Sequence, residues 1–390
     1  MKDFEYYIPQ HLIFGCGSIN KLASMELPGK KALIVTMEDR LYVDKVTELL
    51  EQNNTEYVIF DKVRANPNTD NVNEGARIGI DNNCDFVISI GGGSPVDAAK
   101  CIAMLMHEDP YKNDIWEYVA YYEGHKKPTG CLPHIAISTT AGTGSEVVPG
   151  GVISNDKLNV KLDIGDSVMF PTFSIMDPEL HLTLPKNLTA IIGMDVVFHA
   201  IEGYLDIQHN PYTDMIYLET LRYTNRYLVR AYNNLNDLEA RSGMAIATNL
   251  AGMGESLVDV MSLHAMAHTL GSFHHELPHG LALCLLAPET LSFYCSYPEE
   301  TRRRMGIIAE TLACGDTPED LVSYVIELLK KLGLYNIDYS EYGIDISRAA
   351  EYAHHTVYDI APYMDKDEHS CTVSEIEQIF ASALERNRIN

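Results

Sequence analysis

The sequence predicts an α/β amino-terminal domain with a Rossmann-like, mostly parallel sheet, followed by an all-helical carboxyl-terminal domain. In the first half of the chain, short β-rich runs alternate with segments of helical pattern, which is typical of right-handed βαβ units. After about residue 185 the strand signals stop, and apolar residues recur at helical spacing to the end. The chain has 390 residues, which is enough for two domains with separate cores. We therefore expect one domain at residues 1–185 and a second at residues 186–390.

Four runs are predicted as strands, and their near-continuous apolar character indicates a sheet that is covered on both faces. These runs are KALIVT (31–36), EYVIF (56–60), DFVISI (85–90) and HIAIST (134–139). Helical patterns lie between the first three runs, in VDKVTELLEQNN (43–54) and TDNVNEGARIGIDNN (69–83). In the second half, clear helical patterns occupy LETLRYTNRYLVRAYNNL (218–235), EARSGMAIATNLAGMGESL (239–257) and VSYVIELLKKLGL (322–334).

The composition excludes several classes of protein. A net charge of −26 argues against partners such as nucleic acid or anionic membrane, which bind basic surfaces. The eight cysteines form no C-x-x-C pair, so they indicate neither a disulfide framework nor a thiolate zinc site. The amino terminus lacks the apolar core of a signal peptide, and runs such as LALCLLA (281–287) are too short to span a bilayer. We therefore expect a cytoplasmic protein.

The strongest local signal of the first half is the glycine-rich turn in DFVISIGGGSPVDAAK (85–100). The strand pattern ends at Ile90, three glycines follow, and a helix is expected to begin with Ser94 as its N-cap and Pro95 at its first position. Asp97 then suits the first helical turn. The glycines allow the backbone to approach a ligand closely, and a helix N-terminus attracts phosphate. The turn therefore predicts a phosphate or pyrophosphate site; the alternative is a strand-to-helix turn without a ligand.

A second polar loop, STTAGTGSEV (138–147), follows the fourth predicted strand. Its hydroxyl groups and glycine amides are suited to line the same ligand. A loop that is merely capped by its own threonine and serine side chains is the alternative interpretation.

Two histidine-containing segments of the second half predict a metal site. In GMDVVFHAIEGY, Asp195 and His199 stand four residues apart, on one face of a helix among apolar neighbours. In the later segment HAMAHTLGSFHHELPHG, His264 and His268 have the same spacing, Gly271 is expected to end the helix, and Pro278 precedes His279.

Carboxylate and imidazole groups on facing helices are how metal sites in helical bundles are built, and such a set suits Zn²⁺, Fe²⁺ or another divalent ion. Alternatively, each histidine forms hydrogen bonds within the core, and the aspartate and histidine of the first segment satisfy each other.

In order and spacing, these motifs resemble the iron-dependent (group III) alcohol dehydrogenases, and the resemblance covers nearly the whole chain. GGGSPVDAAK (91–100) is similar to the family's pyrophosphate-binding turn, and TTAGTGSEV (139–147) to its second cofactor loop. SIMDPELHLTLP (174–185) resembles the stretch that leads to its domain boundary. GMDVVFHAIEGY (193–204) and the segment 264–280 resemble its two metal motifs.

The resemblance implies the dehydroquinate synthase-like fold of that family, with a cleft between the two domains. The implied metal ligands are Asp195, His199, His264 and His279. The implied cofactor-binding residues are Gly91, Gly92, Gly93, Ser94, Asp97, Thr139, Thr140, Thr143 and Lys161. His268 is implied as a catalytic residue near substrate and nicotinamide that relays the alcohol proton, rather than as a ligand.

The activity that the resemblance implies is NAD- or NADP-dependent oxidation of a small primary alcohol or diol, or reduction of the matching aldehyde. The metal, Fe²⁺ or else Zn²⁺, is implied to act as a Lewis acid on the substrate oxygen, while the cofactor carries the hydride. The resemblance also implies a homo-oligomer.

The sequence departs from the family pattern at three places. Met37 follows the first predicted strand where many relatives have an aspartate, so the choice of cofactor stays open, with the acidic neighbours favouring NAD. The spacing from His264 to His279 is about one residue longer than in close relatives. The segment DKDEHSCTVSEIEQIF (365–380) replaces the family's N-P-R stretch.

Three alternative functions are compatible with the same residues. The first is a zinc-dependent polyol dehydrogenase of the glycerol dehydrogenase type. The second is a metallohydrolase whose glycine-rich turn holds a substrate phosphate, and the third is a nucleotide-binding module without catalysis. Two cofactor motifs argue against the metallohydrolase, and a complete ligand set argues against the module.

Overall fold

The computed structural model describes residues 3–336 and 338–388, which form two compact units. The amino-terminal unit comprises Tyr7–Thr183. The helical unit begins at Leu184 and also includes the short segment that precedes Tyr7. The α/β fold of the first unit and the all-helical fold of the second confirm the predicted fold class.

The segment before Tyr7 was expected in the first domain, but it groups with the helical unit. The ring of Tyr212 explains this assignment, because the rings of Phe4 and Tyr6 pack on it with centroid distances of 5.3 and 5.6 Å. A contact between residues so far apart in sequence leaves no local pattern to predict it.

Six strands of the described residues form a parallel sheet in the order β1-β8-β5-β4-β2-β3, and two more form an antiparallel hairpin. The sheet strands are β1 (Leu12–Phe14), β2 (Lys31–Met37), β3 (Glu56–Val63), β4 (Phe86–Gly91), β5 (His134–Ser138) and β8 (Phe173–Met176), and the hairpin strands are β6 (Gly150–Asn155) and β7 (Val160–Gly165). The four predicted strands are β2, β3, β4 and β5. The short edge strand, the hairpin and β8 were not predicted.

The strand order places the two polar loops at one edge of the sheet. β2 pairs with both β3 and β4, so the connections turn to opposite sides of β2, which makes the gap between β2 and β4 the topological switch point. In register, Val35 lies opposite Ser89, and Gly91 lies opposite Ser138. The carboxyl ends of β2, β4 and β5 therefore meet at the edge where open α/β sheets bind their ligands.

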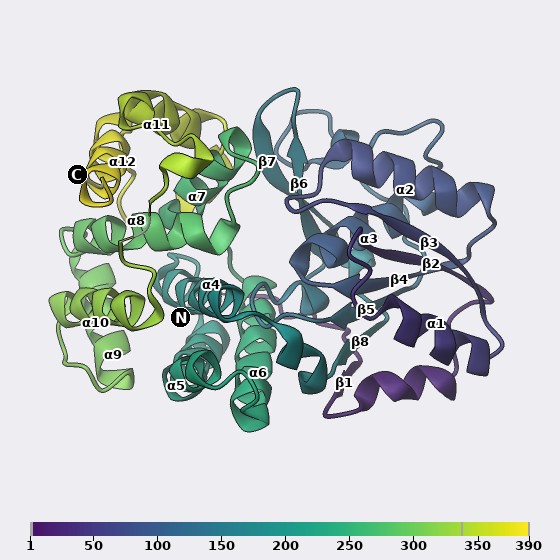
Figure 1. Ribbon diagram of the computed structural model, residues 1–390. Helices are drawn as coiled ribbons and strands as arrows, with labels where there is room; N and C mark the ends of the chain where they lie inside the picture. The colour runs from purple at the N-terminus through teal and green to yellow at the C-terminus, as the bar shows by residue number, and fades with distance from the viewer. Residues whose placement is uncertain (1–2, 337, 389–390) are drawn as a thin grey trace. The chain divides into compact units, whose positions relative to one another are not determined.

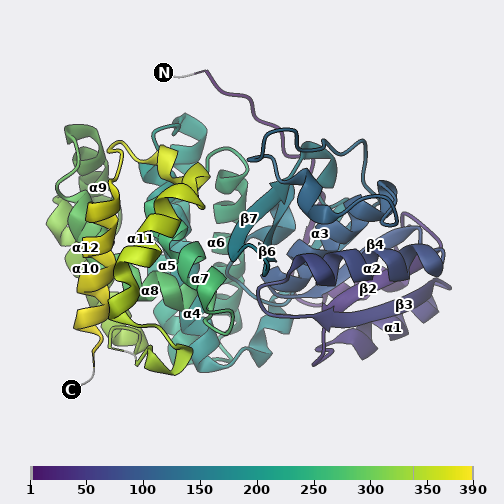
Figure 2. The same cartoon turned by 90° about the horizontal axis from the view of Figure 1, so that it is seen from above.

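Helices cover both faces of the sheet, as the apolar strands predicted. Figures 1 and 2 show α2 (Thr69–Asp81) and α3 (Gly93–His107) on one face and α1 (Val43–Gln52) on the other. β4 is buried from Phe86 to Ile90, and all of β5 is buried.

The helical unit is built around α4, which is hydrophobic on all sides. Its helices are α4 (Lys186–Leu205), α5 (Pro211–Asn233), α6 (Leu238–Glu255), α7 (Ser262–Phe273), α8 (His279–Tyr294), α9 (Glu299–Thr311), α10 (Pro318–Leu332), α11 (Ala349–Tyr358) and α12 (Val373–Arg386). Among the described residues, α4 alone is long and apolar enough to cross a membrane, contrary to the expectation that every apolar run is too short. Because 89% of its apolar window is buried inside the protein, α4 is explained as a core helix.

Helix α7 continues past the glycine that was expected to end it. It runs through Gly271 to Phe273, and the backbone N–H of His274 still donates to the carbonyl of Leu270 at 2.8 Å. Ser262 to Ser272 are all buried, so tertiary packing outweighs the cost of a helical glycine, which is about 1 kcal/mol.

Candidate cofactor site and metal centre

The glycine-rich turn joins β4 directly to α3. Gly91 has a φ of 147°, Gly92 is the N-cap, and the helix starts at Gly93 without a hydrogen bond from a capping side chain. The prediction that Ser94 is the N-cap is therefore wrong, because the helix begins two residues before Pro95. Pro95 is tolerated there, since N–H groups of the first turn have no partner within the helix.

The second loop packs against this turn. The N–H of Thr139 donates to the carbonyl of Gly91 at 2.8 Å. A Cβ added to Gly92 would lie 3.0 Å from the side chain of Thr140, and one added to Gly93 would lie 2.6 Å from that of Thr143. The glycines are thus needed for the two predicted cofactor loops to lie side by side.

Asp97 and Lys100, both on α3, contact the second loop at Ser145. The carboxylate of Asp97 contacts the hydroxyl of Ser145 and accepts the N–H of Val152 at 3.2 Å. The ammonium group of Lys100, which is fully buried, lies 3.5 Å from Asp97 and donates to the carbonyl of Ser145 at 2.8 Å. Asp97 therefore lies just beyond the first turn of α3, and its carboxylate supports the loop.

The remaining predicted cofactor residues lie in the same unit. Lys161 lies on β7 and donates to the side-chain oxygen of Asn66 at 2.9 Å. Met37 ends β2 and is partly buried, whereas Glu38 and Asp39, which follow it, are exposed.

We expect Gly93→Ala to destabilise the protein by about 1–3 kcal/mol and to weaken cofactor binding, because the added methyl group overlaps Thr143. Thermal unfolding and a dinucleotide titration measure the two effects. Thr143→Ala in the same chain removes the overlapping atoms and should restore stability. Equal unfolding temperatures of Gly93→Ala and the original chain would contradict the proposed close approach.

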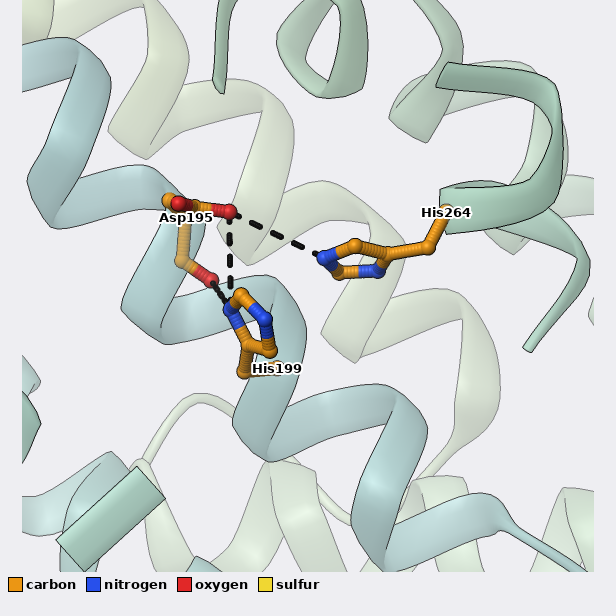
Figure 3. A group of neighbouring side chains, drawn as sticks. All are labelled: Asp195, His199 and His264. Atoms are coloured by element: carbon orange, nitrogen blue, oxygen red, sulfur yellow. Dashed lines mark hydrogen bonds and ion pairs between the residues drawn. The ribbon is translucent and has the colours of Figure 1, made fainter. Parts of the chain in front are cut away.

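Asp195, His199 and His264 form the compact core of the predicted metal centre. The first two lie one turn apart on α4, and His264 approaches them from α7 (Figure 3). One potential ligand atom from each of the three lies within 4.8 Å of the others. The Oδ1 atom of Asp195 is 3.4 Å from Nδ1 of His199 and 3.7 Å from Nε2 of His264.

His279 lies next to this core. It is the first residue of α8, and its Nε2 atom is 3.8 Å from Oδ1 of Asp195. Gly280 allows this approach, because a Cβ at that position would lie 2.5 Å from the backbone oxygen of Ile191 on α4. The fourth predicted ligand is thus next to the other three without belonging to their compact group.

The polar atoms of the centre fit a divalent metal. Oδ1 of Asp195 and Nε2 of His264 are buried and make no hydrogen bond to any described residue, which is costly unless an ion compensates. Burial raises the pKa of Asp195, but the imidazoles of His199, His279 and His264 outweigh this and lower it, so the group is anionic. Three imidazoles and one carboxylate are a donor set for Fe²⁺ or Zn²⁺.

Glu202 is a functional residue that the sequence analysis missed. It is fully buried on α4, and its carboxylate contacts Nδ1 of His264. It also accepts the backbone N–H groups of Met261 and Leu263, at 3.1 and 3.0 Å, where α7 begins. Burial lowers the pKa of His264, but Glu202 and Asp195 outweigh this and raise it to about 10. Glu202 therefore orients His264 with Nε2 facing Asp195, a common arrangement around ligating histidines.

The helical spacing contained a signal for Glu202, because it stands seven residues after Asp195 on the same face of α4. A second buried carboxylate, Asp367, also caps α7, by accepting the N–H of Ser262 at 3.0 Å and its hydroxyl at 2.8 Å. Asp367 lies in the segment that replaces the family's N-P-R stretch, and no local pattern marked it.

Two other histidines of the α7 segment, His268 and His274, have different surroundings from those of His264. The ring of His268 lies 5.2 Å from that of His279 and 5.0 Å from that of Tyr363, between centroids. His274 shares a hydrogen bond of 2.8 Å with the hydroxyl of Tyr352, which gives it a structural role in the core.

Comparison with known proteins identifies the family of the chain. The family profile of the iron-containing alcohol dehydrogenases matches residues 9–178, and that of the C-terminal part of the same family matches residues 189–384. Alcohol dehydrogenase 4 of Schizosaccharomyces pombe is 38% identical over 83% of this chain and 76% of its own length. An NADPH-dependent butanol dehydrogenase of Clostridium saccharobutylicum is 33% identical over 84% of this chain and 83% of its own.

Solved structures of alcohol dehydrogenases share the fold of this chain over nearly its whole length. An alcohol dehydrogenase of a halo-thermophilic archaeon from a Red Sea brine pool superposes with a TM-score of 0.92 at 29% identity, covering 98% of this chain and 100% of its own. The chain belongs to the iron-containing alcohol dehydrogenase family.

Proposed function

We propose that this chain oxidises short primary alcohols or diols, or reduces the matching aldehydes, with a metal held by Asp195, His199, His264 and His279. Its family makes the chain a metal-containing, NAD(P)-dependent alcohol dehydrogenase. The observation that carries the proposal is the buried carboxylate and imidazole of Asp195 and His264, whose facing atoms have no hydrogen-bond partner among the described residues.

A bound Fe²⁺ supplies a Lewis acid that stabilises negative charge on the substrate oxygen, and a bound nicotinamide supplies the hydride acceptor or donor. The residues of the chain prepare the two sites for this chemistry. Asp195 contributes the only anionic group of the proposed ligand set, and Glu202 holds His264 in one orientation.

In the amino-terminal unit, the chain positions the cofactor. The N–H groups of the first turn of α3, without a capping side chain, are suited to hold the pyrophosphate. We assign Gly91, Gly92, Gly93, Ser94, Asp97, Thr139, Thr140, Thr143 and Lys161 to this site. Met37 at the end of β2 carries no charge to repel a 2′-phosphate, so NADP is a candidate beside NAD.

We assign proton relay to His268, because an imidazole exchanges protons near neutral pH and this ring lies beside His279. His268→Ala is expected to retain one metal per chain while kcat falls by about 10²–10⁴-fold, the usual contribution of a general acid or base. Metal analysis and the pH profile of kcat measure the two effects. Loss of the metal from this variant would instead identify His268 as a ligand.

The experiment that tests the proposed function uses protein purified without oxygen and loaded with Fe²⁺. NADH and NADPH absorbance is followed with a panel of short alcohols, diols and aldehydes. Turnover of at least one substrate is expected, and its absence for every substrate would contradict the proposal. Full activity with Zn²⁺ alone would favour the zinc-dependent alternative, and release of phosphate from phosphorylated substrates would favour the metallohydrolase.

We further propose a cytoplasmic homo-oligomer. The strongly acidic composition supports a location away from anionic membranes, and sedimentation of the purified protein measures the number of chains in the assembly.

A further inference from the structure

The imidazole of His199 lies between two carboxylates, the buried one of Asp195 and the partly exposed one of Glu255. Its Nδ1 atom is 3.4 Å from Oδ1 of Asp195, and its Nε2 atom is 3.8 Å from Oε2 of Glu255. Glu255 is the last residue of α6, a helix that contributes nothing to the proposed ligand set. The second carboxylate is thus as close to His199 as Asp195 is to His279, at 3.8 Å.

Exposure distinguishes Glu255 and His279 from the other groups of the metal centre. The side chains of Asp195 and His264 are 5% and 2% exposed, and that of Glu202 is 0% exposed. The side chains of His279 and Glu255 are 21% and 28% exposed. The centre is therefore closed around Glu202, and solvent reaches it at Glu255 and His279.

The stability of α6 does not explain a carboxylate at this position. The C-terminal end of a helix carries partial negative charge, so a cationic side chain is favoured there, and the last turn of α6 contains none. Two more carboxylates, those of Asp206 and Asp259, act together with Glu255 on the phenol of Tyr217. Burial raises the pKa of this phenol well above its usual value, and the three negative charges raise it further. Glu255 therefore adds a partly exposed negative charge to the accessible part of the centre, while Lys366, 3.7 Å from the carboxylate of Asp259, offsets part of the acidic charge around it.

We propose that Glu255 is a specificity-determining residue that selects alcohols with a positively charged ammonium group a few carbons from the hydroxyl. The inference rests on the proposed function, because it assumes that the hydroxyl binds beside His199. With the hydroxyl there, the carboxylate of Glu255 attracts an ammonium tail and repels a carboxylate or sulfonate tail.

The test compares choline with its uncharged isostere, the alcohol in which a tert-butyl group replaces the trimethylammonium group. Calorimetry of the metal-loaded protein gives the two dissociation constants, and steady-state assays give the two values of kcat/KM. We expect the original chain to prefer choline and Glu255→Gln to reduce the preference by about two- to fivefold, the effect of one partly exposed charge pair. Glu255→Asp, which keeps the charge, is expected to retain much of the preference, and metal content is expected to stay at one ion per chain in both variants.

Two results would overturn the inference. One is the same preference ratio in the original chain and in Glu255→Gln. The other is loss of metal from Glu255→Gln, which would mean that this carboxylate acts on the metal rather than on the substrate. Failure of the proposed function is distinguishable, because it would abolish turnover of every alcohol, whereas the calorimetric preference for the ammonium compound does not depend on turnover.

Discussion

Replacing Asp195 by asparagine is expected to lower the affinity for the metal by at least about 100-fold and the activity by about a thousandfold. The substitution preserves the shape of the side chain and removes the only anionic group of the proposed ligand set. In the buried site the imidazoles of His199, His279 and His264 hold the pKa of this carboxyl below its usual value, so its full charge faces the metal. Competition with a chelator measures the affinity, and steady-state assays measure the activity.

A matched control for this variant is Asp316→Asn, which removes an exposed carboxylate of the same unit and should change neither quantity. Thermal unfolding of both variants separates loss of metal from loss of fold. Metal affinity that is unchanged in a folded Asp195→Asn variant would remove Asp195 from the ligand set.

Replacing Glu202 by glutamine is expected to destabilise the protein by about 3 kcal/mol and to lower metal affinity by about 10–100-fold. The amide still offers an oxygen to the N–H groups of Met261 and Leu263, but it lacks the charge that holds Nδ1 of His264. Denaturant unfolding of the metal-free protein measures the first effect, and chelator competition measures the second.

The exposed first-turn residue Glu299 on α9 provides the control, because Glu299→Gln removes the same charge at the start of a helix without a buried partner. A Glu202→Gln variant with unchanged stability and unchanged metal affinity would contradict the role assigned to this carboxylate. If the variant is less stable but binds the metal with full affinity, the role of Glu202 is only to accept the N–H groups at the start of α7.

The alternation of strand and helix patterns was sufficient to predict the fold class, because β2, β4 and β5 are buried on both faces and read as continuous apolar runs. Helix ends were less predictable. Ser94 has a side chain typical of an N-cap, and a glycine such as Gly271 often follows the end of a helix, but α3 starts earlier and α7 extends further. Local preferences worth about 1 kcal/mol yield to tertiary packing.

For the metal centre, sequence spacing was informative only within a helix. The four-residue separation of Asp195 and His199 predicted a shared face, and Glu202 on the same helix was equally predictable. Glu255 and Asp367 come from other elements, the end of α6 and the segment before α12. Their approach depends on how α6 and α7 pack in the helical unit, which no pattern within their own segments encodes.

Titration of the metal-free enzyme with Fe²⁺ under anaerobic conditions tests the central claim most directly. Activity with a short alcohol and NAD or NADP is measured after each addition, beside the metal bound per chain. We predict that activity rises in proportion to bound metal and reaches its maximum at one ion per chain. At the same Fe²⁺ concentrations, Asp195→Asn is expected to show neither bound metal nor activity. Full activity in the metal-free enzyme, or activity that does not follow the bound metal, would contradict the account.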